Sequence, residues 1–584
     1  MCSVLSDSQE EIVRVHEIDD KYRLTRLVCW SVCTVLALLD AWAGRQYTDP
    51  DGISYLDMSD ALLKHNWHLL INPHWSPLYP FLIGVATWLT RPSAYWELPI
   101  VHAVNLVIFL GALASFDFLL RQVICVLGRN HVRQDAHSAE PLPTWMWKLL
   151  AYSLFAWSTF VLGNGLRKVT PDLCVAMFVY LDAGLLLRLR AGANRSGTCL
   201  LLGLTLGLGY LAKAILFPMA FVFMAVAFLV VGNWRKAVRP LAITLLVFGA
   251  IAAPLFISIS RMVGRPSFSE SGNLNIAWQI NGLPMLPFYS SDPPPDLKHP
   301  MSLLYSHPDV FGFAEPIAST YPPWHNPQYW NAGVSTAFNP QAQLREIGQN
   351  LTAFFANLYM APLWVLIAGG IMLLFLNRRA PRKIQHIVKG WPLLVPGVAG
   401  LSAYTLVLVQ PRYIAPFLVL VFLGLFPGIL LQKSRDTAKN AAATLVIAAS
   451  VMVYTSLFIV LHLAMPLPIL QGHGGRFYQV AESLNKEGVR PGGGVAIIGS
   501  GWNGMMWARL ARLHIVAQIP PEDANDFWHA PGPRAKSEVY DAFARTGAEA
   551  VVTEETPPSV GFADWQKVGD TQYYVHILAL PGSK

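Results

Sequence analysis

Two aspartates separated by one residue, Asp49 and Asp51, directly follow the first apolar segment of the chain, and Tyr55 lies four residues after the second of them. Beside low-dielectric surroundings each carboxylate opposes ionisation of the other, so one of them is suited to accept a proton or to hold a cation. The same residues form an Asp-Pro-Asp-Gly sequence, which is also typical of a turn on a solvated loop. The local pattern leaves both interpretations open.

Two basic residues, Lys213 and Arg412, lie at the ends of apolar segments far apart in the sequence. A cation at such a position indicates either a site for an anion such as phosphate or a side chain that extends to the membrane surface. Asp172 begins another apolar segment, where we expect it to cap the N-terminus of a helix. Its neighbours Arg167 and Lys168 can pair with it or with a phosphate.

The long polar stretch at 261–349 is rich in Pro, Trp, Tyr and Asn, and its notable carboxylates are Glu270 and Glu315. Flat aromatic faces beside amide groups are typical of a sugar-binding surface, although such loops also pack as simple lids. No HExxH or CxxC spacing is present, so the sequence identifies no metal ligands. It indicates no certain cofactor, and a requirement for a divalent metal stays open.

The composition indicates a membrane protein. The chain has 584 residues, of which 53% are hydrophobic and 14% are charged, and many apolar segments run for roughly 20 residues, enough to cross a bilayer as a helix. The net charge of +7 comes largely from basic residues in short loops, which reports orientation rather than binding to nucleic acid. None of the six cysteines lies in a long polar stretch, so we expect no disulfide framework.

The basic loops also predict the topology. Lys21, Arg23 and Arg26 precede the first apolar segment, 24–43, and place the N-terminus in the cytoplasm. The later basic clusters also fall on the cytoplasmic side if the short apolar stretch 77–89 is juxtamembrane and does not cross the bilayer. The result is an α-helical polytopic protein of roughly eleven spans in the cell (inner) membrane. Apolar residues from Ile53 to Leu70 are spaced for an amphipathic helix in the interface.

We expect a transmembrane domain at 1–470, with external loops at 44–95 and 261–349, followed by an external α/β domain at 471–584. In that domain the pattern predicts strands at 494–498, 514–519 and 550–553 and helices at 505–513 and 537–546. Gly499, Gly501 and Gly504 satisfy GxGxxG between the first strand and helix. The short helix and the external placement favour a plain Gly-rich turn over a dinucleotide site.

Several motifs occur in an order that resembles the GT-C glycosyltransferases, particularly the branch of the protein O-mannosyltransferases and lipid A aminoarabinose transferases. They are the Asp-x-x-x-Tyr pair of Asp51 and Tyr55, the Thr-Pro-Asp sequence ending at Asp172, the Leu-Ala-Lys-Ala sequence around Lys213 and the Arg-Tyr-Ile-Ala-Pro sequence starting at Arg412. The resemblance covers about residues 24–432.

This resemblance implies a GT-C fold and a sugar donor carried on a polyprenyl phosphate. It implies that Asp51, with Asp49 as second choice, activates or orients the acceptor, and that Lys213 and Arg412 bind the donor phosphate. The chain departs from the branch where Gly52 replaces a glutamate and where His74 stands close to the position of a lysine. These changes weaken the transfer of a phosphate-binding or metal-binding role to His74.

Three functions remain open. The first is a glycosyltransferase that modifies a lipid, glycan or protein acceptor on the outer face of the membrane. The alternative is a transporter or flippase of lipid-linked envelope precursors, but charged residues gather at the ends of the apolar segments and no inverted repeat is visible. The third is a non-catalytic scaffold.

Overall fold

The structure is a computed structural model that describes residues 23–128, 139–141, 143–192, 195–283, 285, 301–313, 319–330, 336–358, 388–428, 430–432, 435–464, 468–529, 532–558 and 563–578. Lys21 and Glu315 lie outside these residues.

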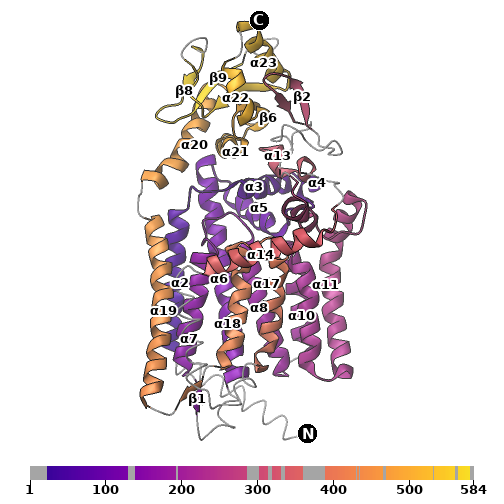
Figure 1. Ribbon diagram of the computed structural model, residues 1–584, viewed down its shortest axis with the longest axis vertical. Coiled ribbons are helices and arrows are strands. Elements are labelled where there is room, and N and C mark those ends of the chain that lie inside the picture. The colour runs from indigo at the N-terminus through magenta and orange to yellow at the C-terminus, as the bar shows by residue number, and fades with distance from the viewer. Residues whose placement is uncertain are drawn as a thin grey trace.

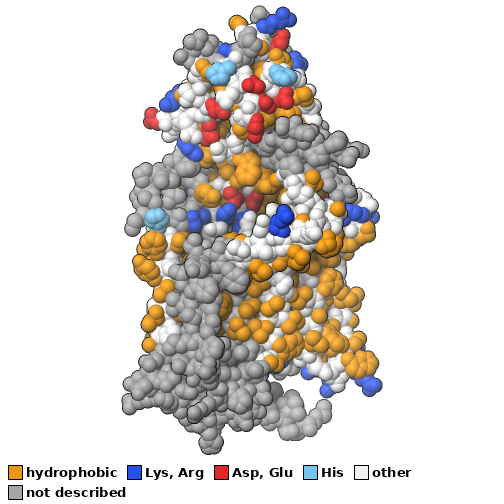
Figure 2. Space-filling view, in the orientation of Figure 1, with side chains coloured by type: hydrophobic (Ala, Val, Ile, Leu, Met, Phe, Trp, Pro, Cys, Tyr) orange, Lys and Arg blue, Asp and Glu red, His pale blue; other side chains and the backbone are white. Residues whose placement is uncertain are grey.

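Long apolar helices stand side by side and form the body of the molecule (Figure 1). Within the described ranges, four segments are long and apolar enough to cross a membrane: Arg23–Ala43, Ala94–Val126, Trp234–Val263 and Ala442–His462. Large hydrophobic side chains such as Leu246 and Phe458 are exposed on them, and hydrophobic side chains cover the flank of the bundle (Figure 2). Such a surface requires lipid, so this is a multi-pass membrane protein. The bundle contains α2 (Arg23–Ala43), α6 (Ala94–Val123), α7 (Thr144–Trp157), α8 (Asp172–Arg190), α9 (Arg195–Ala212), α10 (Leu216–Val231), α11 (Trp234–Val263), α17 (Trp391–Thr405), α18 (Pro411–Leu425) and α19 (Arg435–Ala464).

Two connections at one end of the bundle pair with each other. The strand β1 (Ala139–Pro141), before α7, lies antiparallel to β4 (Leu430–Gln432), after α18. The basic-residue pattern places both connections on the same side of the membrane, and their pairing agrees with that parity. The total of roughly eleven spans, and the side of the membrane that each end faces, stay predictions.

The first long loop folds into three helices at the opposite end of the bundle (Figure 1). They are α3 (Pro50–Leu63), α4 (Trp67–Leu70) and α5 (Leu78–Thr90). The expected single amphipathic helix up to Leu70 is wrong, because α3 ends at Leu63 and the positive φ of His65 breaks it. Most of α3 is buried, so it does not lie in the interface with one polar face in water. At about 20 Å, α5 is too short to cross the bilayer and packs on α3, as expected for a juxtamembrane helix.

A seven-stranded sheet caps this end of the molecule, with the order β2-β3-β6-β5-β7-β9-β8. The strands β5 (Gly494–Ile498) and β6 (His514–Ile519) have the expected bounds, and β7 (Ala548–Thr553) begins two residues early. These three central strands are parallel and almost fully buried, which explains their largely apolar sequences. The other strands are β8 (Gln566–Lys567) and β9 (Tyr574–Ile577), and the accompanying helices are α20 (Pro468–Lys486), α21 (Gly501–Ala511), α22 (Pro521–Trp528) and α23 (Pro533–Arg545).

Two strands of this sheet come from the second long loop. The strands β2 (Ser302–Tyr305) and β3 (Val310–Gly312) form a hairpin, and β3 pairs antiparallel with β6. The sheet therefore extends beyond the part of the chain that follows residue 471, and the expected division of the chain there stays a prediction.

Candidate active site

A cavity of about 500 Å³ lies between the bundle and the capping sheet. This volume is within the range of small-molecule sites, roughly 300–1,000 Å³. At this level of the molecule, acidic and basic side chains gather beneath a group of hydrophobic side chains (Figure 2). Most of the residues proposed from the sequence line the cavity: Asp49, Asp51, Tyr55, His74, Asp172, Lys213 and Arg412.

The start of α3 positions the two first-loop aspartates differently. Asp49 is the N-cap of the helix, since its Oδ1 accepts a hydrogen bond from the backbone N–H of Gly52 at 3.0 Å. Its Oδ2 lies 3.0 Å from Nζ of Lys168. Asp51 lies in the first turn and has no such capping bond; its Oδ2 is 3.2 Å from Nη2 of Arg412. Both aspartates line the cavity and face a cation, but only Asp49 also caps the helix.

Asp172 connects the two cations expected to bind phosphate. Nζ of Lys213 lies 2.5 Å from its Oδ1, and Nη1 of Arg412 lies 3.6 Å from its Oδ2. Capping was the role expected for Asp172, but Pro171 occupies the N-cap of α8 and no capping bond is formed there. The carboxylate instead holds two cations that come from the ends of α9 and α18.

The charges in the cavity balance. Asp49, Asp51 and Asp172 face Lys168, Lys213 and Arg412. Burial raises the pKa of Asp51, and repulsion from Asp49 raises it further, while Arg412 opposes both effects. Asp51 is therefore a stronger base than an ordinary aspartate. Nη1 of Arg412 is buried and, within the described residues, has no hydrogen-bond acceptor.

Aromatic side chains form the other wall of the cavity. His74 packs edge-on against Trp75 and Trp330, with ring centroids 4.4 and 4.9 Å apart. Burial lowers the pKa of His74 to about 3, and Lys213 adds to the effect, so the ring is neutral and does not replace a phosphate-binding lysine. Tyr55 packs on Trp75 at 5.3 Å, and burial raises the pKa of its hydroxyl well above the usual value.

Two of the proposed residues do not line the cavity. Arg167 pairs with Asp40 of α2 at 3.1 Å, and so anchors the connection before α8 to the bundle. Glu270 pairs with Arg265 at 2.7 Å and accepts a hydrogen bond from Ser267. Both have structural partners, and no ion pair described in the structure joins either of them to Asp49, Asp51 or Asp172.

Sequence reasoning missed several residues of the cavity. The pairing of Lys168 with Asp49 was not expected, although Lys168 had been noted beside Asp172. Tyr404 and Gln410 come from the end of α17 and the connection to α18, where only the motif that begins at Arg412 drew attention. Trp502 was hidden inside the GxGxxG sequence.

The glycines of that sequence have packing explanations. A Cβ on Gly501 would lie 2.3 Å from the ring of Tyr321, so only glycine fits there. Gly499 has a φ of +104°, which favours glycine. The glycine at position 501 therefore lets α21 approach Tyr321 of the second loop closely.

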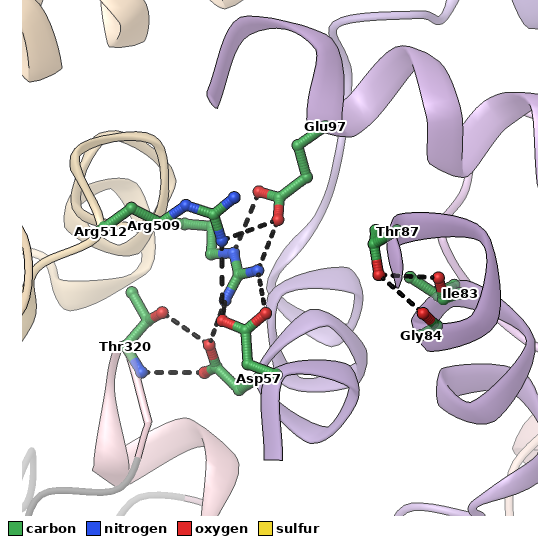
Figure 3. Close-up of polar contacts among 9 residues, drawn as sticks. Asp57, Ile83, Gly84, Thr87, Glu97, Thr320, Arg509 and Arg512 are labelled. Atoms are coloured by element: carbon green, nitrogen blue, oxygen red, sulfur yellow. Dashed lines mark hydrogen bonds and ion pairs between the residues drawn. The ribbon is translucent and has the colours of Figure 1, made fainter. Parts of the chain in front are cut away.

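A buried ion cluster joins α21 to the first loop (Figure 3). The guanidinium of Arg509 lies 3.1 Å from Asp57 and 2.6 Å from both Asp60 and Glu97. Arg512 adds a contact of 2.9 Å to Glu97. We call these five residues the arginine clamp; it fixes the capping sheet over α3.

The second loop is tied to the same clamp. Asp57 accepts hydrogen bonds from the backbone N–H and the hydroxyl of Thr320 at 2.9 and 2.7 Å (Figure 3). In the described part of the chain, no group of three or more His, Cys, Asp or Glu side chains is arranged to hold a metal ion.

Comparison with known proteins identifies the fold. The sequence matches no model of a known protein family and no curated protein. The structure is similar to that of ArnT from Cupriavidus metallidurans bound to undecaprenyl phosphate, with a TM-score of 0.52 and 12% identity over 97% of this chain and 100% of that one. An oligosaccharyltransferase from Archaeoglobus fulgidus, in complex with Zn and sulfate, has a TM-score of 0.47 and 15% identity over 91% of this chain and 67% of that one. The resemblance indicated by the motifs is confirmed at the level of the fold, and the chain has the fold of the GT-C membrane glycosyltransferases.

Proposed function

We propose that the chain is a membrane glycosyltransferase that moves a sugar from a polyprenyl-phosphate carrier to an acceptor on the outer face of the cell membrane. The observation that carries the proposal is the contact of 3.2 Å between Asp51 and Arg412 in a cavity that Lys213 also lines. A base and two phosphate-binding groups thus face one space, as transfer across a single glycosidic bond requires. The similar protein ArnT was solved with a polyprenyl phosphate bound.

The chemistry follows from these positions. Asp51 accepts the proton of an acceptor hydroxyl while the hydroxyl oxygen attacks the anomeric carbon of the donor. The bond from that carbon to the phosphate oxygen breaks, and the electron pair leaves with the phosphate. Lys213 and Arg412 stabilise the phosphate charge. Attack opposite the phosphate inverts the anomeric carbon.

Asp172 holds the cations until the donor arrives. Both pair with it, so they are already in place and need not be gathered from solvent. The donor phosphate takes over these partners, and Nη1 of Arg412, which lacks an acceptor among the described residues, gains one.

The direct test replaces the base. Asp51→Asn keeps the shape of the side chain and removes its charge, so transfer falls by roughly 10²-fold or more. The assay compares, by mass spectrometry, envelope glycans from a deletion strain that expresses the wild-type protein, Asp51→Asn or the exposed control Asp541→Asn. The proposal is supported if one sugar is missing from the envelope glycans of the Asp51→Asn strain but not of the control strain, and if the lipid-linked donor accumulates in the Asp51→Asn strain.

Native mass spectrometry of the purified variant separates catalysis from binding. Asp51→Asn should still bind a polyprenyl monophosphate, because Lys213 and Arg412 remain. Near-normal glycans in the Asp51→Asn strain would contradict the proposal. A donor that fails to appear on the outer leaflet in the deletion strain would favour a flippase.

A further inference from the structure

The cavity carries a continuous tryptophan wall made of Trp75, Trp278, Trp324, Trp330 and Trp502. Trp330 lies at the centre, with ring centroids 5.9, 5.8 and 5.4 Å from Trp75, Trp278 and Trp324, and Trp324 lies 4.8 Å from Trp502. Three separate parts of the chain supply these rings: the first loop, the second loop and the helix α21. The wall therefore forms only when these three distant parts of the chain fold against one another.

One ring of the wall is left available. Trp330 and Trp324 are 1% and 8% exposed, whereas Trp502 is 39% exposed at the edge of the cavity. A simple lid would cover all of its rings, because packing is how such a lid is stabilised. The exposed ring of Trp502 is instead a flat apolar face that lines the cavity.

The wall also carries hydrogen-bonding capacity that the protein does not use. Among the described residues, Nε1 of Trp278 and Nε1 of Trp324 are buried without an acceptor. Asn275 and Ser271, which line the same cavity, place an amide and a hydroxyl nearby. A ligand that combines an apolar face with several hydroxyl oxygens would satisfy these groups.

The wall and the phosphate-binding cations come from different parts of the fold. Lys213 and Arg412 belong to the ends of bundle helices, where a lipid-linked donor arrives from the bilayer. Trp502 belongs to α21, and Trp324 to α13 (Pro322–His325), both of which lie beneath the capping sheet (Figure 1). A molecule that enters from the aqueous side meets the tryptophan wall first.

We propose that the tryptophan wall is the acceptor subsite and that the acceptor presents a pyranose ring, which stacks on Trp502 with its C–H face. The hydroxyls of the ring bond to the indole N–H groups and to Asn275. One of those hydroxyls thereby comes to lie near Asp51. The assignment of the wall to the acceptor rests on the proposed transfer from a lipid-linked donor, and it selects a carbohydrate from among lipid, glycan and protein acceptors.

The test measures sugar binding directly. The purified full chain in lipid nanodiscs is titrated with methyl pyranosides of common hexoses and N-acetylhexosamines, and contacts are recorded by saturation-transfer NMR. We expect the ring C–H protons of at least one pyranoside to show contact with the wild-type protein. Trp502→Ala should weaken this binding by roughly tenfold or more, as removal of an anchoring aromatic ring does, and Trp502→Phe should retain most of it.

The matched control is Trp145→Ala. Trp145 is also 39% exposed but lies at the start of α7, which follows β1 at the other end of the bundle. Equal binding by Trp502→Ala and the wild-type protein would overturn the proposal, as would a wild-type protein that binds none of the pyranosides. Binding of a polyprenyl monophosphate is measured in the same samples. Failure of lipid binding would count against the proposed function, whereas normal lipid binding without a sugar site would count against the acceptor subsite alone.

Discussion

Arg509 offers the sharpest test of how the capping sheet is held over the cavity. Its side chain is 5% exposed and contacts the carboxylates of Asp57, Asp60 and Glu97. The substitution Arg509→Met keeps much of the length of the side chain and removes the guanidinium. Asp60 and Glu97 then share the remaining cation of the clamp, Arg512, which is one-third exposed, whereas Asp57 keeps its hydrogen bonds from Thr320.

The size of the effect follows from burial. Removing one partner from a buried ion pair costs about 3–5 kcal/mol, because the other partner is left charged and unpaired. Arg512 and the partly exposed Asp60 offset some of this cost, so we expect about 3 kcal/mol. That corresponds to an increase of roughly 10²-fold in the population in which α21 is separated from α3.

Amide hydrogen exchange measures this opening locally. Exchange in α21 and α3 of Arg509→Met should rise by that factor, and Asp60→Asn added to the same protein should recover part of the protection. The control is Arg534→Met, which removes an ion pair with Glu538 in which the arginine side chain is 94% exposed. Wild-type protection of α21 in Arg509→Met would refute the reasoning.

Acid should loosen the clamp in the same way. Burial opposes ionisation of Asp60, but Arg509, Arg512 and Lys64 together lower its pKa below the usual value. The stabilisation is therefore present above the pKa of an unfolded aspartate, about 3.9, and is lost as the pH falls through the lowered value of the folded protein. The clamp should hold throughout the neutral range.

Two further predictions concern the base and the Gly-rich turn. Because burial raises the pKa of Asp51, transfer should decline on the acid side with a midpoint above the usual pKa of about 4, and a pH–rate profile with an ordinary midpoint would contradict a buried base. Gly501→Ala should displace α21 from Tyr321, since the new Cβ would lie 2.3 Å from its ring. The control is Gly348→Ala, whose new Cβ meets nothing within 4 Å. Gly501→Ala should therefore unfold at a clearly lower temperature than the control, and equal midpoints of thermal unfolding would contradict the packing explanation.

The sequence was most informative where one physical rule dominates. The strands β5 and β6 have the expected bounds because buried parallel strands are largely apolar, and Gly499 and Pro520 follow their last residues. Asp51 was singled out by its Asp-x-x-x-Tyr spacing to Tyr55, and Lys213 and Arg412 because each lies at the end of an apolar segment, where charge is costly unless it has a use. All three line the same cavity.

The remaining features depend on contacts between distant parts of the chain. Asp172 begins a helix, which suggested a cap, and only the approach of Lys213 and Arg412 makes it their shared partner. The hairpin of β2 and β3 is formed by strands of four and three residues, too short for alternation to be recognised in a loop rich in proline. The strand β6, which pairs with β3, is about 200 residues away, so no local pattern could have indicated the pairing.

That hairpin has a practical consequence for protein production. A soluble fragment cut at residue 471 would contain β6 without β3, and the backbone N–H and C=O groups along that edge of β6 would lose their partners. An apolar parallel strand with a bare edge recruits strands from other molecules, so such a fragment would be prone to aggregate. Fusing residues 301–330 to the fragment would restore the native neighbour of β6.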